Sequence, residues 1–107
     1  MNECSFFHLE KEGPFYTNKD EMREFTAEYL GTLLILSTLA FTGNPLYFVA
    51  ALSLAIAVVG KMSLAHFNPA ITLWSWLAGK IPSSDALTYT SAQGLAAVTV
   101  WILGSLL

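Results

Sequence analysis

Charge is distributed very unevenly along this chain. Residues 1–28 carry ten charged side chains, whereas residues 29–107 carry only Lys61, Lys80 and Asp85. Because a water-soluble surface needs charge on roughly a quarter of its residues, the longer part of the chain cannot present one. The sequence therefore predicts an integral, multi-pass membrane protein that is embedded in a lipid bilayer.

Three apolar stretches have about the length that crosses a bilayer. They cover about residues 22–42, 46–62 and 85–107, and a helix needs roughly 20 residues to span the hydrocarbon core. The run Gly43-Asn44-Pro45 is a turn signal between the first two stretches. The first two spans should therefore form an antiparallel hairpin.

A fourth apolar stretch, about residues 69–79, is too short to span the membrane. Its helix would be roughly 16 Å long, about half the thickness of the hydrocarbon core. Lys61 and Lys80 flank it and favour the same aqueous side, so the segment should enter and leave on one side. We therefore predict an all-α membrane protein with three transmembrane helices and one re-entrant half-helix.

The lysine and arginine residues indicate the orientation of the chain. All five fall on one side of this arrangement, and basic residues favour the cytoplasmic side of a membrane. Residues 1–21 would then be a polar N-terminal cytoplasmic tail, and residues 22–107 would form the membrane unit.

Few residues are suited to catalysis or to metal binding. The chain has two histidines, His8 and His66, and a single cysteine, Cys4. The charges form no basic patch of the kind that binds nucleic acid. The sequence therefore predicts no enzyme, no metal site, no cofactor and no nucleic-acid partner.

Three blocks of sequence follow one another in a fixed order: AEYLGT over residues 27–32, GKMSLAHFNPAIT over residues 60–72, and YTSAQG over residues 89–94. Their order and spacing resemble the first repeat of the aquaporin, or major intrinsic protein, family. The resemblance extends from about Arg23 to Leu107. It implies one of the two inverted repeats of that fold, which is a half-aquaporin.

The resemblance implies that Asn68, Pro69 and Ala70 form the pore motif. Proline fits the first turn of a helix, because the amide there has no intrahelical partner, so Pro69 would start the half-helix and Asn68 would cap it. The positive end of the half-helix would disfavour cations at the membrane midplane. Irregular backbone at this depth is tolerated where it lines a water path. The carbonyl groups expected to line that path are those of Leu64, Ala65, His66 and Phe67.

The resemblance also implies roles for residues outside the motif. Glu28, His66 and Gln93 would support the loop that precedes the half-helix, although for Glu28 a proton relay with His66 is the alternative. Phe48 matches the aromatic residue of the selectivity ring in water-selective members, the alternative being an ordinary aromatic near the membrane interface. Leu64 stands where the family usually has glycine, so the loop cannot freely adopt a positive φ there.

The resemblance therefore predicts that the protein is a channel of the aquaporin type, for passive transport of water or a small neutral solute. A single repeat cannot enclose a pore, so a second copy in a homo-oligomer or a partner chain in a heteromer would complete it. The alternative is a non-conducting membrane subunit or modulator that associates with other channel proteins.

Overall fold

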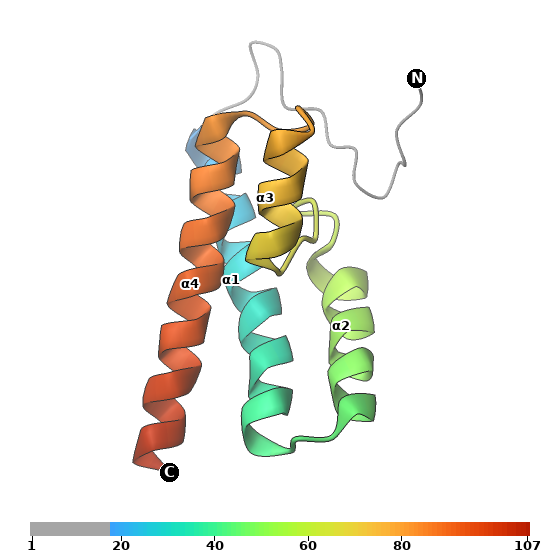
Figure 1. Ribbon diagram of the computed structural model, residues 1–107, viewed down its shortest axis with the longest axis vertical. Coiled ribbons are helices and arrows are strands. Elements are labelled where there is room, and N and C mark those ends of the chain that lie inside the picture. The colour runs from blue at the N-terminus through green and yellow to red at the C-terminus, as the bar shows by residue number, and fades with distance from the viewer. Residues whose placement is uncertain (1–17) are drawn as a thin grey trace.

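The computed structural model describes residues 18–107, and every regular element in this range is a helix. The helices are α1 (Asn18–Phe41), α2 (Pro45–Val59), α3 (Pro69–Leu77) and α4 (Ser83–Leu106), and Figure 1 shows their arrangement. The fold of the described residues is therefore all-α. Most of the predicted N-terminal tail lies outside them.

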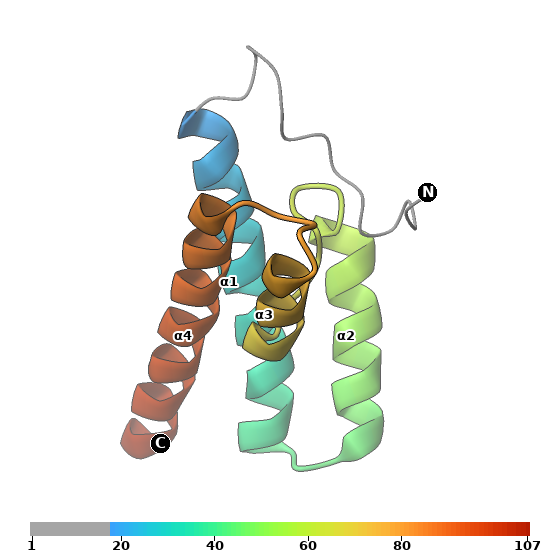
Figure 2. The ribbon, with the colours of Figure 1, turned by 45° about the horizontal axis from the view of Figure 1, so that its top comes forward.

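α1 is the central helix of the unit. It packs against α2 and against α4, whereas α3 packs against α4. α1 and α4 have 24 residues each and are about 36 Å long, while α3 has nine residues and is about 14 Å long. In Figures 1 and 2, α3 begins near the middle of the long helices and runs towards the end where α1 and α4 begin.

Four helix ends differ from the predicted boundaries by two residues or more, and one of them is the end of α3, which ends at Leu77 rather than near residue 79. α1 already begins at Asn18, the first described residue, rather than near residue 22. α2 ends at Val59 rather than near residue 62, because Gly60 forms its C-terminal cap. α4 begins at Ser83 rather than near residue 85, directly after Pro82.

Asn44 and Asn68 cap α2 and α3 with the same hydrogen bond. Asn44 Oδ1 accepts from the Leu46 N–H at 2.9 Å, and Asn68 Oδ1 accepts from the Ala70 N–H at 2.8 Å. Proline follows each asparagine in the first turn of its helix, where the missing amide costs no hydrogen bond. The two caps differ in location, because α2 begins at the turn that joins it to α1, whereas α3 begins midway along the long helices (Figure 1).

Apolar surface is exposed over much of the unit. α4 is the one described helix that is long and apolar enough to cross a membrane, whereas α2 is apolar but has 15 residues. Large side chains such as Leu54, Val58 and Trp101 are more than half exposed. Exposed apolar surface on this scale is typical of a face that contacts lipid or another protein.

The interior combines apolar packing with a set of buried polar side chains. One apolar cluster joins α1, α2 and the α2–α3 loop (residues 60–68), and a second joins this loop to the start of α4. We call the set of buried polar side chains the polar cluster. Its members are Glu28, Ser63, His66, Thr72 and Gln93, and each is at most 2% exposed.

Candidate functional site

Asn68 lies at the N-terminal end of α3 with its side chain exposed. Its Oδ1 atom is used by the helix cap, and within residues 18–107 its Nδ2 group makes no hydrogen bond. Pro69 and Ala70 are also exposed. The site therefore presents an amide donor beside the end of a helix that carries about half a positive charge.

Two amides in the middle of the α2–α3 loop donate to buried hydroxyl groups. The Leu64 N–H donates to Tyr89 Oη at 2.9 Å, and the Ala65 N–H donates to Ser63 Oγ at 3.0 Å. Leu64 and Tyr89 are also packed together in the cluster at the start of α4. The contacts between Leu64 and Tyr89 attach the loop to α4.

Glu28 accepts four hydrogen bonds and is completely buried. Its Oε2 atom accepts from Ser63 Oγ at 2.7 Å and from the His66 N–H at 3.0 Å. Its Oε1 atom accepts from the Phe67 N–H at 2.8 Å and from Gln93 Nε2 at 3.0 Å. An ionised carboxylate has about four acceptor sites and no donor, so these donors satisfy it. Glu28 thereby joins α1, the loop and α4.

The polar cluster continues from Glu28 to His66 through Gln93 and Thr72. Gln93 Nε2 also donates to Thr72 Oγ1 at 3.0 Å, and Thr72 Oγ1 lies 2.8 Å from His66 Nδ1. A proton relay needs groups that both accept and donate, but the Gln93 amide nitrogen donates to both of its neighbours. The route from Glu28 to His66 through Gln93 therefore cannot pass a proton, because the Gln93 amide nitrogen only donates along it.

Three carbonyl groups of the α2–α3 loop accept no hydrogen bond from the polar cluster. Among residues 18–107, no hydrogen bond ends on the carbonyl oxygen of Leu64, Ala65 or Phe67. Ala65 and Phe67 have φ values of 59° and 52°, a conformation that costs about 1–2 kcal/mol for a residue with a side chain. The positive φ values thus flank His66, and none falls at Leu64, where the family usually has glycine. Such strain persists only where the surrounding contacts fix the backbone, and here the polar cluster does so.

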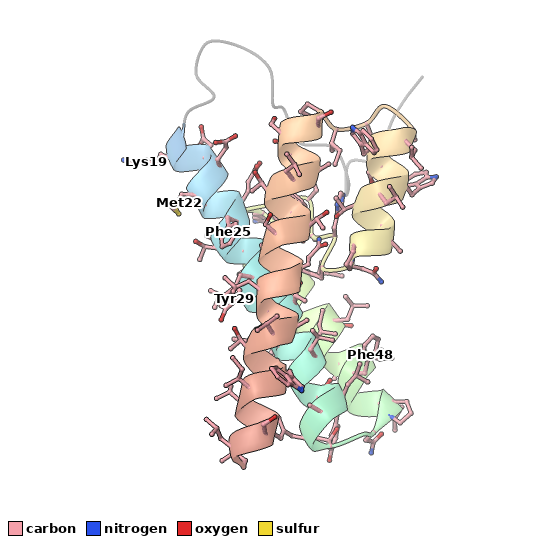
Figure 3. The ribbon with its side chains drawn as sticks, turned by 60° about the vertical axis from the view of Figure 1, so that its left-hand side comes forward. Lys19, Met22, Phe25, Tyr29 and Phe48 are labelled. Atoms are coloured by element: carbon pink, nitrogen blue, oxygen red, sulfur yellow. The ribbon has the colours of Figure 1, made fainter. Side chains whose placement is uncertain are left out.

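Phe48 stands apart from this network. It lies on α2, is partly buried, and packs against the apolar cluster that contains Ala51 and Phe67. In the view of Figure 3 it lies below the N-terminal end of α3. The structure therefore brings Glu28, His66 and Gln93 together and leaves Phe48 outside their hydrogen bonds.

Three residues of the site were given no role from the sequence: Ser63, Thr72 and Tyr89. Each hydroxyl makes a hydrogen bond that holds the loop or its supporting side chains. The signal that could have identified them is a hydroxyl-bearing side chain within the blocks of residues 60–72 and 89–94. Within residues 18–107, no group of three or more His, Cys, Asp and Glu side chains is arranged to hold a metal ion.

Replacing Tyr89 with phenylalanine is expected to lower the free energy of unfolding by about 1–3 kcal/mol, because the buried Leu64 N–H loses its acceptor. Denaturant unfolding in detergent measures this change. Tyr29→Phe is the matched control, since Thr99 Oγ1 loses its bond to Tyr29 Oη but keeps the one it donates to the Leu95 carbonyl. A loss in Tyr29→Phe as large as that in Tyr89→Phe would contradict the assigned role of Tyr89.

Comparison with known proteins identifies related sequences. The family model described as major intrinsic protein matches residues 16–106. The chain is 34% identical over 86 residues to glycerol uptake facilitator protein-like 6 of Lactiplantibacillus plantarum. The matched region is 72% of this chain and 40% of the relative. It is 30% identical over 104 residues to aquaglyceroporin AqpS of Rhizobium meliloti, and here the matched region is 82% of this chain and 45% of the relative.

A further relative is aquaporin Z of Photorhabdus laumondii, which is 27% identical over 103 residues, 78% of this chain and 45% of the relative. No solved structure matches the chain. The chain thus spans less than half the length of these curated relatives.

Proposed function

The chain belongs to the major intrinsic protein family, and on this premise we propose that it forms one half of a channel for passive transport of water or a small neutral solute. Proteins of this family are membrane channels and not enzymes, and membership implies an integral membrane protein.

The exposed amide of Asn68 at the start of α3 carries the proposal. Water and small alcohols need both a donor and an acceptor when they leave bulk solvent. Asn68 Nδ2 supplies a donor, and the carbonyls of Leu64, Ala65 and Phe67 supply acceptors close to it in sequence. The positive end of α3 opposes the entry of cations. Together these groups suit a neutral solute.

The helix lengths support a membrane arrangement for this half. α1, α2 and α4 would be the spans, the α2–α3 loop would enter from one side, and α3 would begin near the midplane and return to that side. Residues 1–21 would form a cytoplasmic tail and residues 22–107 the membrane unit. The interior position of Glu28 agrees with this arrangement, because a carboxylate at such depth must be satisfied by protein groups.

A second half is needed to enclose the pore. Asn68, Pro69 and Ala70 are exposed, and loop backbone facing lipid would cost several kcal/mol for each unsatisfied group. The relatives are more than twice as long as the matched region. A second copy of the chain or a partner chain would supply the complementary half.

The solute of the proposed channel would be a small uncharged molecule. The relatives carry the names of a glycerol uptake facilitator and of aquaporins, which favours small uncharged molecules. Phe48 would contribute an aromatic edge to a selectivity ring and would favour water. Its packing against the apolar cluster leaves one part of the ring to face a pore.

Stopped-flow light scattering of proteoliposomes tests the proposal. Vesicles that hold the purified chain are compared with empty vesicles for shrinkage in an impermeant osmolyte and in glycerol. Permeability above that of empty vesicles supports a pore made by copies of the chain, and labelling of a cysteine introduced at Leu107 from both sides would then reveal inverted copies. If the folded chain gives no increase, alone or with a co-purified membrane partner, the channel proposal fails and the non-conducting subunit takes its place.

A further inference from the structure

Gly31 of α1 lies directly against the ring of Phe67. Phe67 is 6% exposed and belongs to the cluster with Ala51 and Ala55. A Cβ atom built on Gly31 would lie 2.6 Å from Phe67 Cδ1, 2.7 Å from Cζ and closer still to Cε1. Real Cβ atoms do not approach other carbon atoms this closely, so a side chain at residue 31 would displace the ring.

The backbone of Phe67 is fixed at the same time from another direction. Its N–H donates to Glu28 Oε1 at 2.8 Å, and its φ value is 52°. Glu28 lies one helical turn before Gly31 on the same helix. One short stretch of α1 therefore makes two contacts with Phe67. The Glu28 carboxylate accepts from its N–H, and Gly31 packs against its ring.

The residue that follows Phe67 is Asn68. Because the peptide unit between them is rigid, a change in the backbone of Phe67 turns or shifts Asn68. The cap from Asn68 Oδ1 to the Ala70 N–H transmits the same change to the start of α3.

We infer that Gly31 is a positioning residue for Asn68. The absence of a side chain at residue 31 admits the Phe67 ring, which keeps Phe67 in its left-handed conformation and directs the Asn68 amide. The consequence for transport rests on the proposed function, whereas the contact and its effect on the Asn68 amide do not.

Glycine-to-alanine substitutions test this inference with a matched control. Gly31→Ala adds a methyl group against Phe67, whereas Gly94→Ala adds the same group to α4, where no heavy atom lies within 4 Å. Both changes raise helix propensity alike. The double variant Gly31→Ala with Phe67→Ala removes all three ring atoms that meet the added methyl and so returns space to it.

The readout is the side-chain amide signal of Asn68 in the 15N-labelled full chain in detergent, assigned by its loss in Asn68→Asp. The Asn44 amide is the internal reference, because its helix cap is the same. We expect the Asn68 signal to shift by more than its linewidth in Gly31→Ala, to stay in place in Gly94→Ala, and to move back in the double variant. The Asn44 signal should stay in place throughout.

Three results would overturn the inference: an unmoved Asn68 signal in Gly31→Ala, an equal shift in Gly94→Ala, or no recovery in the double variant. If Gly31→Ala fails to fold, recovery of folding in the double variant supports the contact, and failure of both variants overturns it. Vesicle permeability is measured on the same proteins. An Asn68 shift without any permeability in the unsubstituted chain would reject the proposed function and leave the positioning role intact.

Discussion

Glu28→Gln is expected to lower the free energy of unfolding by about 2–6 kcal/mol. Glutamine offers one acceptor oxygen where the carboxylate has two, and its amide would face groups that are themselves donors. About two of the four donors around Glu28 would lose their acceptor, and each buried unsatisfied group costs about 1–3 kcal/mol. The donors at risk come from the loop and from α4: Ser63 Oγ, His66 N, Phe67 N and Gln93 Nε2.

Denaturant unfolding in detergent and amide hydrogen exchange together measure this effect. Exchange at the His66 and Phe67 amides should quicken most, because both donate to Glu28. Glu21→Gln removes a charge from the first turn of α1 and should change stability by less than about 1 kcal/mol. Equal effects of Glu28→Gln and Glu21→Gln would show that Glu28 does not hold the loop.

Asn68→Asp is expected to reduce the permeability of a conducting preparation about tenfold or more. Aspartate keeps an oxygen that caps α3, but it has no side-chain donor when ionised and adds a negative charge at the exposed site. Loss of a hydrogen bond worth about 1.4 kcal/mol in the transport step corresponds to a tenfold change in rate. The capped helix itself should persist, so circular dichroism should remain unchanged.

Asn44→Asp provides the matched control for this prediction. Asn44 makes the same cap bond to the amide two residues on and is likewise followed by proline, but it lies in the turn between α1 and α2. Stopped-flow permeability of Asn44→Asp vesicles should therefore equal that of the unsubstituted chain. If both variants lose permeability equally, a general effect of the added charge explains the loss and Asn68 has no special role.

Much of the helical plan was predictable because its signals are local. Apolar runs, the turn at Gly43-Asn44-Pro45 and the proline after Asn68 each act within a few residues, and the family resemblance follows from the same local blocks. Helix ends were predicted less well. The boundary between Val59 and Gly60 depends on where the loop must leave the helix, which an apolar run that continues to Met62 does not reveal.

The sequence by itself thus determined that the chain is helical and apolar, and that Asn68 and Pro69 begin a short helix. Only the tertiary structure decided how this motif is held. The Glu28 contacts join residues 35 to 65 positions apart, and the pairing of Gly31 with the Phe67 ring joins α1 to a loop beyond α2. Such contacts depend on how the helices pack. For the same reason the left-handed backbone falls at Ala65 and Phe67, where buried partners on other helices offset its strain.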